Sequence, residues 1–328
     1  MKLIRIAVAA LVASGLALPA VTAAAKELKF GHVGAPGSLF QMSADKFAEI
    51  ANAKLPEGWS VAVFGASQLG KDRELMQKLK LGTVDFALPS SVMSSVSPEF
   101  GLFEMPYLVK DRDHMGRIEQ EIFWPTLHPA AEGEGYQVLA LWENGFRNIT
   151  NNSRPINTPA DLEGIKLRTP KGAWRVKMFQ SYGANPTPMA FSEVFVALQT
   201  GVIDGQENPL AQIASAKFQE VQKYLSMTGH VYTPAYVTVS KTHFGGLPAD
   251  VQDALKAAAQ EAQGFVYETA AQLEVDLLAE LKAGGITVND ADKQAFIDAS
   301  ASIYEAFAKE VEGGKEMVDK ALSLASGS

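Results

Sequence analysis

The strongest constraint in this sequence is a regular alternation of short apolar strands and amphipathic helices. It begins at residue 26, where Leu28 and Phe30 alternate with Lys29 as in a strand. Ser38 then precedes apolar residues at helical spacing and is suited to cap that helix. The predicted order is strand 26–34, helix 38–55, strand 59–65, helix 71–81 and strand 84–91. Strands joined to helices by short connections are typical of a parallel α/β sheet.

The alternation starts again after Gly135. A one-turn helix is expected at 157–164, because Thr158 is a suitable N-cap and Asp161 stands where a capping box needs an acid. The other segments are predicted as strands 135–145, 165–170 and from 202, and helices 173–183 and 191–201. The second series predicts a second α/β unit, so we expect two domains.

One long amphipathic segment, 248–283, keeps helical spacing until Gly284 and Gly285 end it. A helix of that length is expected to kink or to cross between domains. A last helix is predicted at about 293–311. Nothing in the sequence resembles a flexible linker, so several chain crossings between the two units are expected.

The first 25 residues have the pattern of a cleaved secretory signal peptide. Lys2 and Arg5 precede a short apolar run, and small residues follow at Ala23 to Ala25. The alternative is an uncleaved anchor, but the run is too short to span a bilayer. We therefore expect an exported protein.

Composition limits the partners of the exported chain. Removing Lys2 and Arg5 takes the formal charge from -8 to -10, which disfavours nucleic acid and anionic membrane surfaces. The sequence has no cysteine, so the fold depends on its core rather than on disulfides.

The sequence shows no motif for catalysis, metal binding or a cofactor. Its five histidines are scattered, and no nucleophile elbow, phosphate loop or dinucleotide loop is present. We expect no cofactor and no metal. A catalytic group assembled from distant residues stays possible, with Glu207, Glu143 and His230 as weak candidates for a base acting on hydroxy acids.

Three polar residues stand at strand ends, where ligands bind in open α/β sheets: Arg168, Arg147 and Asn208. Arginine suits a carboxylate because its planar fork donates two parallel hydrogen bonds. The alternatives are a surface ion pair for either arginine and a helix cap for Asn208. Phe191 and Trp174, nearby, are expected in the core unless other evidence places them at a site.

Four stretches in order, "SQLGKDREL", "NGFRNITNNSRPINTPADLEGIKLRTP", "PTPMAFSEVFVALQTGVIDGQENP" and "FQEVQKYLSMTGH", carry a family resemblance. From Leu28 to the final helix, the chain resembles the solute-binding proteins of tripartite ATP-independent periplasmic (TRAP) transporters, the DctP-type family. The resemblance implies a two-domain periplasmic binding protein fold of the α/β class, with a long helix spanning both domains and a ligand cleft between them. The implied domains are 26–145 plus about 233–270, and 146–232 plus about 271–328.

The resemblance also assigns site residues. It implies that Arg168 pairs with the substrate carboxylate, that Arg147 and Asn208 assist, and that Phe191 packs over the ligand. Asp72, in the first of the four stretches, is a further candidate.

Departures from the family's pattern bear on the substrate. Sialic acid-binding branches carry Asn and Glu where this sequence has Val33 and Ser90, which suggests a smaller or less polar acid. Ser90 stays a candidate. Lys171 is expected to be solvated unless it receives a second anionic group. Trp174 either lines a tighter pocket or belongs to the core.

The expected function is capture of a small organic monocarboxylate, of hydroxy or sugar acid type. The expected partners are this ligand and the TRAP membrane subunits, and the protein is expected to be a monomer. The alternatives are a binding protein of an ATP-driven importer, a periplasmic enzyme acting on hydroxy acids, and a sensory receptor.

Overall fold

The computed structural model describes residues 26–325, so the predicted signal peptide lies outside the described residues. Within that range nine strands form one sheet in the order β2-β1-β3-β8-β4-β7-β5-β6, with β9 paired to β8. The strands are β1 (Lys26–Gly31), β2 (Trp59–Phe64), β3 (Phe86–Ala87), β4 (Tyr136–Asn151), β5 (Lys166–Thr169), β6 (Asn185–Pro188), β7 (Gly205–Asn208), β8 (Tyr224–Ser240) and β9 (Thr287–Asp290).

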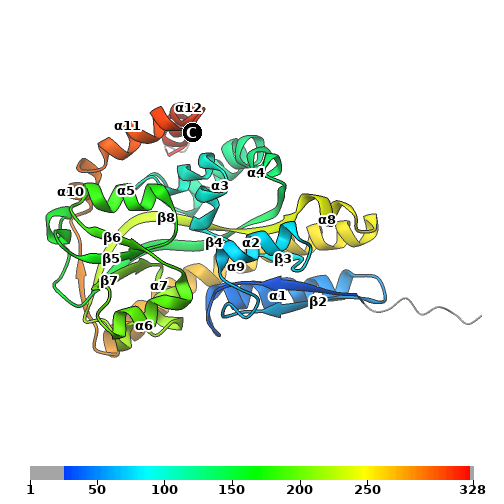
Figure 1. Ribbon diagram of the computed structural model, residues 1–328, viewed down its shortest axis with the longest axis horizontal. Coiled ribbons are helices and arrows are strands. Elements are labelled where there is room, and N and C mark those ends of the chain that lie inside the picture. Colours follow the sequence, from blue (N-terminus) through cyan, green and yellow to red (C-terminus); the bar gives the residue numbers. More distant parts are fainter. Residues whose placement is uncertain (1–25, 326–328) are drawn as a thin grey trace, which may run out of the picture.

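The two longest strands, β4 and β8, pair antiparallel through the middle of the sheet and run across the molecule (Figure 1). Strands β1 to β3 lie on one side of this pair, and β5 to β7 lie on the other. The predicted two-domain α/β fold is confirmed, and both halves are built on the same central ribbon.

The sheet is mixed rather than wholly parallel. The predicted parallel pairing is confirmed for β1 with β2 and β3, and for β5 with β6 and β7. The antiparallel strand β8 was not predicted, because Gly229 and Pro234 interrupt its alternation. Both residues lie where β4 and β8 fall out of simple register, so the ladder accommodates them as irregularities.

Helices cover both halves of the sheet. Those predicted in the alternating segments are present as α1 (Leu39–Lys54), α2 (Asp72–Lys80), α5 (Ala173–Ser181) and α6 (Val194–Gln199). The one-turn helix is η4 (Pro159–Leu162), where the Thr158 N–H donates to Asp161 Oδ2 at 2.9 Å. The remaining short helices are η1 (Ser91–Ser95), η2 (Pro98–Glu104), α3 (Arg112–Ile118), η3 (Glu119–Leu127), α4 (His128–Gly133), η5 (Phe191–Glu193), α7 (Leu210–Ser215), η6 (Phe218–Glu220) and α8 (Lys241–Gly245).

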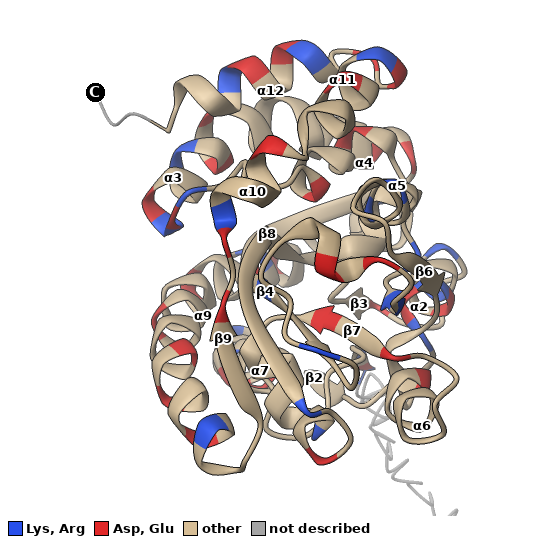
Figure 2. Ribbon diagram, turned by 90° about the vertical axis from the view of Figure 1, so that its left-hand side faces the viewer, with Lys and Arg blue, Asp and Glu red and all other residues tan. Residues whose placement is uncertain are grey.

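The long helix is confirmed as α9 (Ala249–Ala283), 35 residues without a break. Its first part packs Leu255 and Val266 into a core shared with α1, β1 and β4. Its last part places Leu281 in a separate core with residues of α6, α7 and β8. The helix therefore connects the two halves of the molecule (Figures 1 and 2).

The predicted single helix at 293–311 is wrong in one respect, because the structure divides it into α10 (Lys293–Asp298) and α11 (Ala301–Glu310). The break is at Ser300, whose hydroxyl donates to the Phe296 carbonyl at 2.6 Å and lies 2.6 Å from the Tyr182 hydroxyl. A serine that bonds back to its own helix bends it. A further helix, α12 (Gly314–Ser323), was not predicted.

The cores do not divide at the predicted domain boundaries. One core cluster joins Phe100 and Phe123, from the segment before residue 146, to Phe179 and Phe307. Helices α11 and α12 pack against α5 and η2 respectively, so the C-terminal helices contact both halves. We keep the domain limits given above as a proposal.

Truncating α9 at its buried face tests how much the fold depends on this helix. Leu255 is fully buried, so Leu255→Ala is expected to lower the free energy of unfolding by about 2–5 kcal/mol, from lost burial and the cavity left behind. Val275 lies on the same helix and is 70% exposed, so Val275→Ala is the control, with an expected loss below about 0.5 kcal/mol. Urea unfolding monitored by circular dichroism measures both. Equal losses would show that α9 is not packed as described.

Candidate functional site

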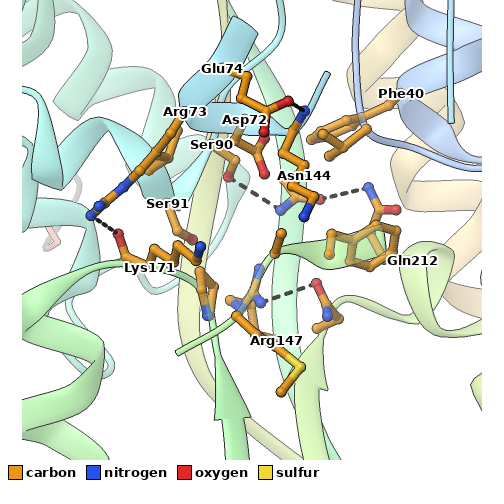
Figure 3. A pocket seen from close by; sticks show the side chains of 18 residues that line it. Phe40, Asp72, Arg73, Glu74, Ser90, Ser91, Asn144, Arg147, Lys171 and Gln212 are labelled. Carbon is orange, nitrogen blue, oxygen red and sulfur yellow. Dashed lines mark hydrogen bonds between the residues drawn. The ribbon is translucent and has the colours of Figure 1, made fainter. Parts of the chain in front are cut away.

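A cavity of about 110 Å³ lies between the two halves of the sheet. One side is formed by residues near β1 and β3 and at the start of α2, and the other by residues near β5, β6 and β7. Figure 3 shows its lining: Val33, Phe40, Lys71, Asp72, Arg73, Glu74, Ser90, Ser91, Val92, Asn144, Arg147, Pro170, Lys171, Met189, Ala190, Phe191, Asn208 and Gln212.

The cavity lies at the carboxyl ends of the parallel strands. Val33 follows β1, Ser90 follows β3, Lys171 follows β5 and Phe191 follows β6, while Asn208 is the last residue of β7. Ligands of open α/β folds bind in this position because the strand ends leave a crevice there. The topology alone therefore points to this cavity as the site.

Arg168, on β5, is 3% exposed and is not itself among the lining residues, but it is bonded to Met189, which is. Its Nε and Nη2 both donate to the carbonyl of Met189, at 3.1 and 2.8 Å, which fixes the plane of the guanidinium. Burial lowers its pKa to about 10, so the group keeps its charge at neutral pH. Among the described residues no carboxylate forms an ion pair with it at 4.0 Å or less. Arg168 is therefore a buried cation without a bonded anion, next to the cavity.

Arg147, on β4, has its anion within the protein. Its Nε donates to Glu207 Oε2 at 2.5 Å, and its Nη2 donates to Glu207 Oε1 at 2.9 Å and to Asn208 Oδ1 at 3.1 Å. The paired arginine still lines the cavity. It presents a fixed donor there without adding net charge.

Glu207 is the centre of a fully buried charge network. Its Oε2 also accepts from Arg175 Nη1 at 2.6 Å and lies 3.1 Å from His230 Nε2. Arg175 Nη2 in turn lies 2.9 Å from Glu104 Oε2. Burial favours the neutral acid, but the charges of Arg147 and Arg175 outweigh it and hold the pKa of Glu207 well below its usual range.

Further polar groups of the lining come from Asp72, Ser90, Ser91, Asn144 and Gln212. Burial raises the pKa of Asp72 to about 6, although the positive charge of Arg168 opposes that shift. The Asn144 amide donates to Ser90 Oγ and Thr233 Oγ1, each at 3.2 Å, and accepts from Gln212 Nε2 at 3.2 Å. In the described part of the chain, Ser91 Oγ and Gln212 Oε1 are buried without a hydrogen-bond partner. Unpartnered buried polar atoms next to a cavity are suited to a polar ligand.

Ser90 and Asn208 lie at the cavity but are already bonded. The Ser90 hydroxyl donates to the Pro234 carbonyl at 2.6 Å, and the Asn208 amide donates to Gln206 Oε1 at 2.5 Å. Asn208 therefore orients Arg147 and does not cap α7, the alternative that the sequence left open.

The two aromatic candidates, Phe191 and Trp174, lie in different surroundings. Phe191 lines the cavity, with its ring 5.8 Å from that of Phe218. Trp174 is not among the lining residues; its ring packs edge-on against Phe307 at 5.2 Å and it is 5% exposed. The structure thus places Trp174 in the core, because α5 turns that face towards α11.

Sequence reasoning missed Phe40, Ser91, Asn144 and Gln212. Asn144 lies three residues before Arg147 on the same strand, which is the one local signal available for it. Gln212 and Phe40 lie on helices, where the sequence gives no reason to distinguish them from core-packing residues. Only the folded structure brings them together at the cleft.

Contacts cross the mouth of the cavity. Lys71 Nζ lies 2.5 Å from Glu193 Oε1, and Arg73 Nη2 donates to the carbonyl of Lys171 at 3.3 Å. Ser95 Oγ donates to the same carbonyl at 2.9 Å (Figure 3 shows the Arg73 contact). These contacts join the start of α2 and η1 to the loops after β5 and β6, so they hold the two halves together over the cavity.

The described residues, 26–325, contain no cluster of three or more His, Asp or Glu side chains arranged to hold a metal ion. No helix in that range has the length and apolar character needed to cross a bilayer.

Comparison with known proteins decides the family. Residues 30–310 match the family model DctP, "Bacterial extracellular solute-binding protein, family 7". The chain belongs to this family. It is a periplasmic solute-binding protein of the TRAP type, as the sequence motifs predicted, whose members bind small carboxylates and deliver them to membrane subunits.

Relatives match over nearly their whole length. The 2,3-diketo-L-gulonate-binding periplasmic protein YiaO of Escherichia coli K12 is 34% identical over 97% of this chain and 98% of its own. The sugar acid binding protein DctPAm of Advenella mimigardefordensis, solved with galactonate, has a TM-score of 0.88 at 33% identity, covering 92% and 98% of the two chains. A TRAP solute-binding protein of Polaromonas sp. JS666, bound to D-erythronate, has a TM-score of 0.86 at 34% identity, covering 90% and 98%.

The buried charge network predicts that a conservative substitution of Glu207 greatly lowers the stability of the fold. Glu207→Gln leaves Arg147 and Arg175 buried without their shared anion, and is expected to lower the free energy of unfolding by about 3–5 kcal/mol. Because the pKa of Glu207 is depressed, this stabilisation is present above the ordinary value of 4.5 and is lost only as pH falls through the folded pKa.

Urea unfolding at neutral pH and at pH values below 4.5 measures this difference. Glu310→Gln, which removes an exposed partner of Lys177, is the control and is expected to cost less than about 1 kcal/mol. If the two variants lose equal stability, the network does not hold the site together.

The ion pair between Lys71 and Glu193 is expected to stabilise the closed cleft only modestly. Both side chains are about half exposed, so Glu193→Gln is expected to weaken ligand binding by roughly two- to fivefold without altering the fold. Calorimetric titration at low and at high salt measures it, and the difference from wild type is expected to shrink in 1 M salt, where exposed charges are screened. An unchanged affinity at low salt would exclude a role in closure.

Proposed function

We propose that this protein captures a small hydroxylated monocarboxylate, of the aldonic or hydroxy acid type, and delivers it to its TRAP membrane subunits. The observation that carries the proposal is the buried guanidinium of Arg168, which has no ion pair within residues 26–325 and contacts a cavity lined by both polar and apolar side chains. Galactonate, D-erythronate and 2,3-diketo-L-gulonate, named for three relatives, support this substrate class.

Arg168 is proposed to bind the carboxylate. A buried cation is stable only when it is paired or well hydrogen-bonded, and here its bonded partner is a neutral carbonyl. A substrate carboxylate supplies the missing charge through charge-assisted hydrogen bonds. Arg147 is proposed to add a fixed donor, and Asn208 to hold it in position.

Other lining residues are proposed to form hydrogen bonds with the substrate's hydroxyl groups. Asp72 can accept hydrogen bonds, Ser91 can both donate and accept, and the Gln212 Oε1 has no hydrogen-bond partner within residues 26–325. Val33 and Phe40 line the same cavity and offer no polar partner. This mixture favours a short hydroxylated chain over a larger polar substrate such as sialic acid. Phe191 is proposed to pack against the carbon chain of the ligand.

Lys171 is proposed to lie outside the carboxylate subsite. It is exposed at the mouth of the cavity, and its backbone carbonyl, not its ammonium group, makes the contacts across the cleft. Among residues 26–325, Arg168 is the one buried arginine without an ion pair, which matches a ligand with one carboxylate.

We further propose that the protein is not an enzyme. Glu207, Glu143 and His230, the candidate bases, are committed to partners within the protein. Glu207 is shared by Arg147 and Arg175, and Glu143 accepts two hydrogen bonds from Arg112, at 2.7 and 2.9 Å. Burial lowers the pKa of His230 to about 4, although Glu207 opposes the shift, and its Nε2 faces Glu207. None of the three is free to take a proton from a substrate.

The test is a thermal-shift screen of ligand-stripped mature protein against aldonic acids, hydroxy acids, uronic acids, dicarboxylates and sialic acid. Ligand at about 100 times its Kd adds about 2.7 kcal/mol, and we expect the aldonic and hydroxy acids to give the largest shifts. Arg168→Ala is expected to bind the same ligand at least 100-fold more weakly, a loss of about 2.7 kcal/mol.

Arg117→Ala is the matched control, because Arg117 lies on α3, donates to the Leu324 carbonyl and is not among the residues that line the cavity. Its affinity is expected to equal that of wild type. Binding by Arg168→Ala within twofold of wild type would contradict the carboxylate assignment. A response to dicarboxylates alone would contradict the substrate class and leave the family unaffected.

A further inference from the structure

A second cavity, of about 400 Å³, lies on the other face of the sheet from the ligand cleft. Adjacent residues of a strand point to opposite faces. On β4, Arg147 lines the cleft, whereas its neighbours Phe146 and Asn148 line this second cavity. We call it the rear cavity. Its lining is Tyr107, Val109, Lys110, Phe146, Asn148, Met227, Gly229, Glu274, Lys293 and Ile297.

The rear cavity is formed by an irregular stretch of the central ribbon. Arg147 pairs with Val231 and Ile149 pairs with Ser226, so Asn148 alone faces the segment Met227–His230. Bulges of this kind are found next to functional sites, where they redirect side chains. A hydrogen bond fixes the conformation of this bulge, since Asn148 Oδ1 accepts from the Gly229 N–H at 3.0 Å.

A strained residue borders the same bulge. Tyr107 has φ 56°, in the left-handed region that a bulky side chain rarely adopts. Its N–H donates to the His230 carbonyl at 2.9 Å, and its hydroxyl donates to the Thr228 carbonyl at 3.0 Å. These two bonds hold the turn against β8 and set Lys110 at the edge of the cavity.

The chemistry of the lining is amphipathic and cationic. Lys110 Nζ donates to the Tyr107 carbonyl at 2.9 Å, and Lys293 extends over Gly229; no ion pair involves either lysine within residues 26–325. Asn148 is 4% exposed, and its Nδ2 makes no hydrogen bond in that range. Glu274, the one acid of the lining, is bonded to Arg112 at 2.8 Å.

Apolar side chains complete the cavity. Val109, Phe146 and Met227 line it, and Ile297 is 39% exposed at its edge. Cavities lined by apolar side chains with a few fixed polar groups are the usual sites for small molecules. We propose that the rear cavity is a second binding site, for a small organic anion with an aromatic or alkyl body. The two lysines and the Asn148 amide bind the anionic group, and the apolar side chains bind the body.

The test uses 1-anilinonaphthalene-8-sulfonate, an aromatic sulfonate whose fluorescence rises in an apolar site. Titration of the ligand-stripped mature protein is expected to show one saturable site. Lys110→Gln combined with Lys293→Gln is expected to weaken it at least tenfold, and Ile297→Glu, which places a negative charge at the edge, is a second variant with the same expectation.

Lys282→Gln combined with Lys309→Gln is the control, because both lysines are exposed and lie outside the cavity lining. It removes the same total charge and is expected to leave the affinity unchanged. Arg168→Ala is likewise expected to leave it unchanged, which separates the rear cavity from the cleft. Loss of probe binding in Arg168→Ala, equal affinities in the two lysine pairs, or no saturable binding would each overturn the proposal.

Discussion

The site depends on one buried carboxylate, that of Glu207. It joins Arg147 of β4, Arg175 of α5 and His230 of β8 to its own strand, β7. Through Arg175 it also reaches Glu104 of η2, in the segment before residue 146. Buried charges are costly unless each is paired, and this network satisfies that condition for two arginines at once. Its consequence is that Arg147 is fixed in place and neutralised, whereas Arg168 is a buried arginine with no ion pair within residues 26–325.

The two kinds of charge contact in the molecule have different effects. The Glu207 network is buried and fixes structure, whereas the pair Lys71 and Glu193 is half exposed and contributes little by itself. A weak contact across the cleft suits a receptor that has to open again. A strong one would keep the halves together without ligand, because ligand shifts closure only by the difference between its affinities for the two states.

Local patterns predicted what local forces determine. The strands and helices of both α/β units, the one-turn helix at 159–162 and the length of α9 follow from alternation, caps and helical spacing. Strand β8 could not be predicted this way, because Gly229 and Pro234 break the alternation and only pairing with β4 makes the segment a strand. Likewise, nothing in the local sequence shows that the Ser300 hydroxyl, at the break between α10 and α11, also contacts Tyr182.

The candidate site was predictable in part for the same reason. Arg168, Arg147 and Asn208 stand in recognisable motifs, so sequence alone could propose them. The strand-end argument holds for Arg168 and Asn208 but not for Arg147, because β4 continues past it to Asn151. Phe40, Asn144 and Gln212 come from three separate elements, and nothing in their local sequence separates them from packing residues. Trp174 was a candidate that the structure places in the core. Its closeness to the Arg168 motif in sequence does not determine which way a helical side chain points.

The continuous ribbon of β4 and β8 has a mechanical consequence. Within residues 26–325, the two halves share these strands and α9, each of which runs from one half into the other. Opening of the cleft therefore requires dihedral changes within these three long elements. The stiffness of those elements, set by residues remote from the cleft, then governs how far the protein opens and how quickly it returns.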